Sequence, residues 1–112
     1  MDLDEIKKEL CPGLAWVDNV TLRYAKMNGL NGICYFQTQH NQHIATIQIN
    51  DMLADMPISC KATVWHELCH AEPWIVEGHV DGHNCAWLNR LFRKPWLAIW
   101  NLTIEKLLTV RL

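Results

Sequence analysis

Four of the chain's six histidines fall within one stretch, HELCHAEPWIVEGHVDGH, which runs from residue 66 to residue 83. His66 and His70 are four residues apart, and on a helix this spacing places both side chains on one face, with Cβ atoms about 5–6 Å apart. Two imidazoles at that separation can bind one zinc ion at about 2.0–2.1 Å. The stretch therefore predicts a helix that carries two metal ligands.

Glu67 follows the first of these histidines and projects about 100° further around the helix, because an α-helix has 3.6 residues per turn. That direction is poor for a third ligand but good for reaching a water bound to the metal. We therefore expect Glu67 to act as a general base. Zinc with three protein ligands keeps a position for water and lowers the pKa of that water to about 7.

The residues alone leave two candidates for the third ligand, His79 and His83. The long metzincin pattern needs a histidine six residues beyond His70, where this chain has Val76. A glutamate ligand from a later helix would have to be Glu105, because it is the only acidic residue after position 81. A histidine at the start of the next helix can complete the site instead.

Length and composition predict one domain over residues 1–112. Half of the residues are hydrophobic and the net charge is −2, so the overall charge does not direct the chain to nucleic acid or anionic lipid. The five cysteines include no CxxC pair, and the amino-terminal MDLDEIKKEL has no apolar signal region. We expect reduced thiols and a cytoplasmic location. The apolar stretch 95–112 is too interrupted by charges to cross a membrane.

Alternating apolar residues predict three strands, over 20–24, 33–37 and 44–49. The segment MNGLNG, residues 27–32, contains two Asn-Gly pairs, which favour tight turns, and the polar segment 38–43 has the composition of a hairpin loop. Three strands joined in this way predict an antiparallel meander. We expect His40 and His43, in the second loop, to be solvated.

Helical spacing of apolar residues predicts helices over 2–10, 62–71, 83–92 and 96–109. The second helix is expected to end at Glu72, because a proline disfavours helical backbone in the residue before it and Pro73 follows. The fold class is therefore α+β, a small three-stranded antiparallel meander packed against the helix of the histidine pair and against further helices. The tryptophans are expected to pack in the core, namely Trp65, Trp74 and Trp87.

Three segments together resemble a known family. ATIQIN (45–50), VWHELCHA (64–71) and DGHNCAWLNRLFR (81–93) are similar to the SprT-like, or Spartan-type, zinc metalloprotease domain, over about residues 16–93. The family pattern has HExxHA and later Gly-His, followed four residues on by an aromatic residue. Gly82-His83 with Trp87 fits this pattern. The resemblance therefore implies a minimal zincin with zinc on His66, His70 and His83.

The resemblance further implies a zinc-dependent peptidase that acts on a protein or peptide substrate, with Glu67 activating water. The substrate would add as a strand to an exposed sheet edge, here expected to be 44–49. Many SprT-like proteins carry a zinc ribbon of paired CxxC motifs, whereas this chain is expected to be a single metallopeptidase domain without one. A basic cluster that could contact DNA is made of Arg90, Arg93 and Lys94 with Trp96.

The rival interpretation is a non-catalytic binding module that zinc stabilises and that captures a peptide or a DNA-bound partner. A purely structural zinc site usually has four protein ligands. A fourth ligand from Cys69 or His79 would therefore favour the module, whereas three ligands and an intact Glu67 favour the enzyme. Asp81 and Glu77 are candidates for orienting a ligand imidazole through its second nitrogen.

Overall fold

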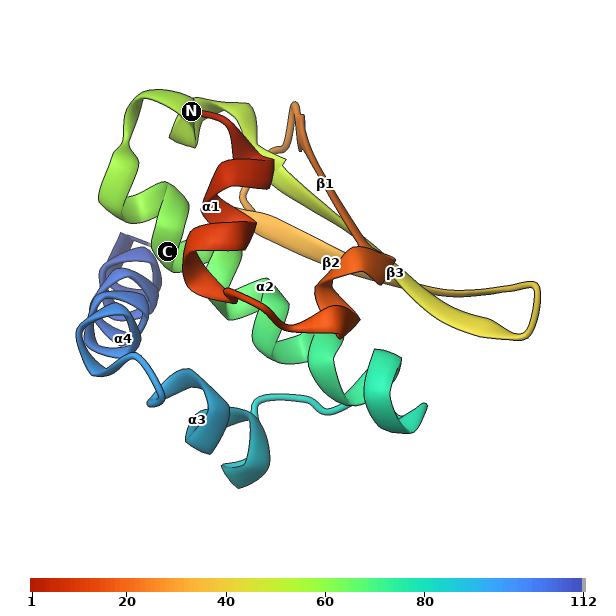
Figure 1. Cartoon of the computed structure of the whole chain (residues 1–112). Coiled ribbons are helices and arrows are strands. Elements are labelled where there is room, and N and C mark those ends of the chain that lie inside the picture. Colours follow the sequence, from red (N-terminus) through yellow and green to blue (C-terminus); the bar gives the residue numbers. More distant parts are fainter. Residues whose placement is uncertain (112) are drawn as a thin grey trace.

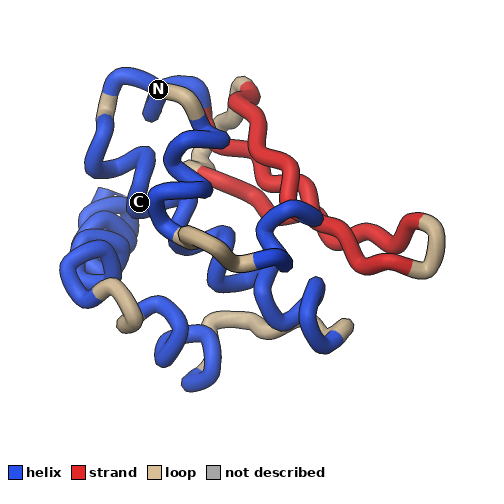
Figure 2. Tube along the Cα trace, in the orientation of Figure 1, coloured by secondary structure: helices blue, strands red, loops and turns tan. Residues whose placement is uncertain are grey.

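The computed structural model describes the backbone of residues 1–111 and the side chains of residues 1–103. It is an α+β fold of four α-helices, two short 3-10 helices and one three-stranded sheet. Figures 1 and 2 show the helices gathered on one side of the sheet and the β2–β3 hairpin projecting beyond them. In chain order the elements are α1 (Leu3–Leu10), η1 (Ala15–Asn19), β1 (Val20–Ala25), β2 (Gly32–Gln39), β3 (Gln42–Asn50), η2 (Asp51–Asp55), α2 (Pro57–Glu77), α3 (Cys85–Leu91) and α4 (Pro95–Arg111).

The sheet is mixed, with strand order β1-β3-β2. β2 and β3 form the predicted antiparallel hairpin, and its turn uses the positive φ angles of His40 and Asn41. β1 instead pairs in parallel with β3, from Val20 opposite Ala45 to Ala25 opposite Asn50. The predicted antiparallel meander is therefore wrong, because β3 and not β2 is the central strand.

The side chain of Asn50 explains why the two Asn-Gly pairs do not make a hairpin. Its amide group donates hydrogen bonds to the carbonyl oxygens of Met27, at 3.2 Å, and Leu30, at 2.9 Å. The backbone N–H of Asn50 donates to the carbonyl of Asn31 at 2.8 Å. These bonds hold the segment between β1 and β2 around the end of β3. As a result β1 and β2 pair with opposite edges of β3.

Helix α2 is the element against which the others pack. It contacts β2, β3, α1, α3 and α4, and its buried residues point in every direction around the helix, as expected for a helix inside a core. Val64 and Leu68 are fully buried, and the Trp65 ring is buried with its Nε1–H donating to the carbonyl of Leu91 at 2.9 Å. The metal-ligand candidates on α2 are therefore held by a rigid element.

Pro73 does not end α2, which continues to Glu77. A proline inside a helix removes one backbone donor, here the donor for the carbonyl of Cys69, four residues earlier. Arg90 replaces it, because its Nε–H donates to that carbonyl at 2.9 Å. The predicted end at Glu72 is wrong because a side chain from α3 satisfies the group that Pro73 leaves without a partner.

The carboxyl end of α2 is closed by Gly78 and by the hairpin turn. Gly78 adopts a left-handed conformation, φ 76°, and its N–H caps the helix. The His43 ring lies against this end, stacked on Trp74 at 4.3 Å between centroids and hydrogen-bonded from Nδ1 to the Trp74 carbonyl at 2.9 Å. His40 is exposed as predicted, whereas His43 is only partly exposed, because its ring packs against Trp74 and Gly78.

All five cysteines lie in the described part of the chain and are free thiols. Cys11, Cys60 and Cys69 are buried, and burial raises the pKa of the Cys11 thiol to about 11. Within the residues that the structure describes, no helix combines the length and apolar character that a bilayer crossing requires.

Gly78 and Gly29 offer a matched pair of substitutions, because their φ angles are 76° and 78°. Gly78→Ala and Gly29→Ala should each lower the free energy of unfolding by about 1–2 kcal/mol through left-handed strain. Gly78→Ala should cost more, because its Cβ would overlap the His43 ring whereas nothing lies within 4 Å of a Cβ at Gly29. Urea unfolding of both variants measures this, and equal losses would contradict the packing of His43 on α2.

Candidate metal centre

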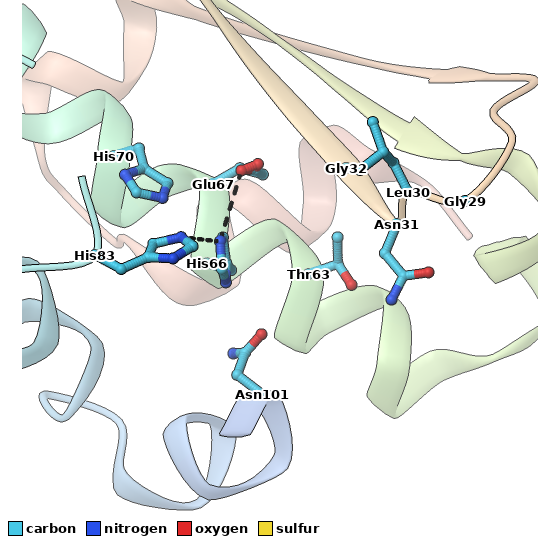
Figure 3. Close-up of a pocket in the computed structure, with 10 residues that line it drawn as sticks. All are labelled: Gly29, Leu30, Asn31, Gly32, Thr63, His66, Glu67, His70, His83 and Asn101. Atoms are coloured by element: carbon cyan, nitrogen blue, oxygen red, sulfur yellow. Dashed lines mark hydrogen bonds and ion pairs between the residues drawn. The ribbon is translucent and has the colours of Figure 1, made fainter. Parts of the chain in front are cut away.

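The structure brings together three of the predicted residues, His66 and His70 from α2 and His83 from the loop before α3. One nitrogen of each lies within 4.8 Å of the others, and the Nε2 atoms of His66 and His83 are 3.2 Å apart. Figure 3 shows the three rings turned toward one another. His79 is half exposed and faces Glu77 and Asp81 instead, at 3.3 and 3.4 Å. Geometry therefore favours His83 over His79 as the third member.

The His70 ring is oriented by the loop that carries His83. Its Nδ1 donates to the main-chain carbonyl of Asp81 at 3.0 Å, so its Nε2 can face the cluster. A metal-binding histidine is commonly fixed in this way through its second nitrogen. We expected a carboxylate of Asp81 or Glu77 to orient a ligand, but the contact is made by the Asp81 backbone, and Glu77 faces His79.

Trp87 forms an apolar wall behind all three histidines. Its ring centroid lies 4.9 Å from that of His66, 5.3 Å from that of His70 and 4.5 Å from that of His83. Burial, assisted by the neighbouring His70 and His83, lowers the pKa of His66 to about 3, and burial also lowers the pKa of His70. Both α2 histidines are therefore neutral at pH 7, which is the state that binds a metal ion.

Glu67 lies beside the histidines, with Oε1 4.0 Å from His66 Nε2. The residue is 5% exposed, and burial raises its pKa to about 7. Its Oε2 atom is buried and has no hydrogen-bond partner among the described residues. Buried polar atoms are almost always partnered in folded proteins, so an orphan of this kind points to a functional role.

The histidines and Glu67 share one pocket of about 320 Å³ between α2, α4 and the loop that joins β1 to β2. Strand β2 approaches α2 so closely that a Cβ at Gly32 would lie 2.9 Å from Thr63 and 3.2 Å from Glu67. The pocket is lined by residues that Figure 3 draws as sticks, namely Gly29, Leu30, Asn31, Gly32, Thr63, His66, Glu67, His70, His83 and Asn101.

Three imidazoles are a donor set that fits zinc with one coordination position left for water. Within the described residues, the group able to hold a metal comprises these three histidines and no fourth residue. Cys69 is buried outside it, and burial strongly raises the pKa of its thiol. Neither Cys69 nor His79 therefore supplies the fourth ligand of a closed site.

The loop that carries His83 is anchored by an ion pair between Asp81 and Arg90. The two side chains are 10% and 12% exposed, and Arg90 Nη2 lies 2.6 Å from Asp81 Oδ2. This guanidinium, together with the Asn84 amide, lowers the pKa of the Asp81 carboxyl. Asp81 lies two residues before His83, so its ion pair with Arg90 fixes the backbone from which that histidine projects.

The predicted basic cluster is engaged within the molecule. Arg90 pairs with Asp81, Arg93 Nη1 lies 2.9 Å from a carboxylate oxygen of Glu72, and Lys94 lies over the Trp65 ring at 5.1 Å. These contacts neutralise both arginines. The cluster therefore adds no support for DNA binding.

Sequence reasoning missed three contributors to the pocket. The loop 29–32 was expected to form a turn, not a wall of the site, and neither Thr63 from α2 nor Asn101 from α4 was assigned to it. Asn101 is one of the few polar residues in an apolar stretch, and this is the only sequence signal that marks it.

The family model of SprT-like proteins matches residues 5–93, which is most of the chain. The chain therefore belongs to the SprT-like family, as its motifs indicated. The human protein named germ cell nuclear acidic protein is 37% identical over 46 residues; this match covers 41% of the present chain and 7% of that protein. No solved structure gave a significant match.

Arg90 and Arg93 form a matched pair for testing the loop anchor. Arg90→Met should lower the free energy of unfolding by about 3–5 kcal/mol, because it removes the guanidinium that pairs with the Asp81 carboxylate and leaves the Cys69 carbonyl without its donor. Arg93→Met removes a side chain that is 56% exposed and should cost less than about 1 kcal/mol. Chemical denaturation of both variants tests this, and similar losses would contradict the anchoring role of Arg90.

Proposed function

We propose that this protein is a zinc-dependent metallopeptidase, with zinc on His66, His70 and His83 and with Glu67 as general base. The observation that carries the proposal is the shared pocket, in which three imidazoles converge beside a buried carboxylate oxygen that has no hydrogen-bond partner among the described residues. Membership of the SprT-like family supports the same conclusion. The absence of a fourth ligand among the described residues favours an enzyme over the zinc-stabilised binding module.

Zinc, when bound, supplies a Lewis acid that activates water and stabilises negative charge on the peptide carbonyl oxygen. Glu67 takes a proton from the attacking water and delivers it to the amide nitrogen that leaves. Trp87 and the buried face of α2 cover one side of the His66 and His70 imidazoles, whereas His83 is exposed. His70 and His83 are held by the loop around Asp81, so the nitrogen atoms stay directed at one point.

The sheet order changes where an extended substrate would bind. The expected site on 44–49 is wrong, because β3 is paired on both sides. β2 is an edge strand, and its first residue, Gly32, lines the pocket next to Glu67. We infer that a peptide would add to β2 through backbone hydrogen bonds and so pass in front of the three histidines.

The first test of the proposed centre is its metal content. Wild-type protein purified without chelator or affinity metal should hold one zinc per chain. His79→Ala should retain the zinc, because that side chain faces Glu77 and Asp81 outside the cluster, whereas His83→Ala should lose most of it. Elemental analysis measures this, and loss of zinc from His79→Ala alone would contradict the assignment of His83.

The test of catalysis is Glu67→Gln. This substitution keeps the shape of the side chain and should leave zinc bound, but hydrolysis of labelled casein should fall by about 10²–10⁴-fold, the usual contribution of a general base. His79→Ala serves as the active control. Unchanged hydrolysis by zinc-loaded Glu67→Gln would refute the role of Glu67, and zinc-loaded wild type without activity would favour the binding module.

A further inference from the structure

The pocket extends beyond the three histidines into a part that has walls of its own. We call this part the outer pocket, and it is lined by residues 29–31 of the loop before β2, by Thr63 of α2 and by Asn101 of α4. Figure 3 shows Asn31 and Thr63 on the opposite side of His66 from His83. A peptide that adds to β2 passes Gly32, so the next part of that peptide enters the outer pocket.

The lining of the outer pocket contains no ionisable side chain. The carboxylate that lines the pocket elsewhere is that of Glu67, which is 5% exposed. A basic side chain entering here would have only Glu67 as a partner, and this pairing would occupy the proposed base. An acidic side chain would find no basic partner in the lining, and its binding to zinc would displace the attacking water. Either charge would therefore oppose cleavage.

The three polar side chains of the outer pocket differ in the hydrogen bonds that they can still make. The Asn101 amide donates both hydrogens to main-chain carbonyls, at 2.9 and 3.0 Å. The Thr63 hydroxyl donates its one hydrogen to the carbonyl one turn earlier in α2, at 2.8 Å. The Asn31 side chain makes no hydrogen bond with the described residues. Of the three, Asn31 can therefore both donate to a ligand and accept from it.

The backbone that carries this free amide is fixed. The carbonyl of Asn31 accepts a hydrogen bond from the N–H of Asn50 at 2.8 Å, and the Asn50 side chain donates to the carbonyl of Leu30 at 2.9 Å. The next residue, Gly32, begins β2 and packs closely on α2. A partly exposed amide on a fixed backbone can bind a ligand with a small loss of conformational entropy.

We propose that Asn31 is a specificity-determining residue, and that the outer pocket takes an uncharged side chain from a residue next to the scissile bond. The inference rests on the proposed function and deepens it, because it names the substrate class as extended peptides with an uncharged residue on one side of that bond. The neutral amide of Asn31 contacts the entering side chain. A charge introduced at this position should therefore change which side chain is accepted.

Asn31 and Asn28 form a matched pair for this test. Asn31→Asp and Asn28→Asp each replace an amide by a carboxylate of the same shape in the same loop, and Asn28 is exposed and outside the pocket. Asn31→Asp should raise the preference for lysine over glutamine by about 10–100-fold, because the new carboxylate pairs with the lysine in place of Glu67. Asn28→Asp should change the same preference by less than about fivefold, as expected for an exposed charge.

The measurement has two stages. Cleavage sites in a library of extended peptides are first identified by mass spectrometry. Values of kcat/KM are then compared for three peptides that differ only in a glutamine, a lysine or a glutamate next to the scissile bond. The wild type should cleave the glutamine peptide at least about tenfold faster than the other two. Equal cleavage of all three by the wild type, or an equal change of preference in Asn31→Asp and Asn28→Asp, would overturn the inference.

A second variant and a binding readout complete the design. If Asn31→Asp does not fold, Asn31→Lys repeats the test with the opposite sign and should favour the glutamate peptide. If the zinc-loaded wild type cleaves no peptide of the library, the proposed function fails, and binding of the three labelled peptides is measured by fluorescence polarisation instead. Tightest binding of the glutamine peptide would still support recognition by the outer pocket, whereas equal binding or no binding would overturn it.

Discussion

The arrangement of the site depends on two contacts that the Arg90 guanidinium makes. It donates to the carbonyl of Cys69 that Pro73 leaves without a helix partner, so α2 continues past the proline. The same group pairs with Asp81 and thereby holds the loop that returns to α2. One partly buried side chain from α3 therefore determines both the length of the central helix and the path of the segment that brings His83 to it.

The geometry of the histidine cluster depends on elements outside α2 as much as on α2 itself. The loop supplies His83 and, through the Asp81 carbonyl, the orientation of His70. Helix α4 lines the pocket with Asn101, and α3 supplies the wall of Trp87. Such outer contacts restrict a ligand ring to one tautomer and one direction, which a bare pair of histidines on a helix lacks.

Local spacing predicted what depends on local geometry. The separation of His66 and His70, the helix that carries them and the β2–β3 hairpin all follow from periods that a single segment contains. The failures involve partners that are distant in sequence. β1 lies parallel to β3 because Asn50 holds the intervening loop, and α2 passes Pro73 because Arg90 lies 17 residues further along. The place of Asn101 in the pocket escaped notice for the same reason, since its hydrogen-bond partner in α2, the Ala62 carbonyl, is 39 residues earlier.

The buried carboxylate of Glu67 has a consequence for the energetics of the whole fold. The Glu67 side chain lies close to Gly32 and Thr63, but its Oε2 atom receives no hydrogen bond from the described residues. Removing such a group from water is unfavourable and opposes folding. The core around α2, with Val64 and Leu68 fully buried, must therefore be stable enough to tolerate a local defect. In the folded state the Glu67 Oε2 atom has lost its water without gaining a hydrogen bond from the described residues. A ligand that donates a hydrogen bond to this oxygen would therefore stabilise the folded protein.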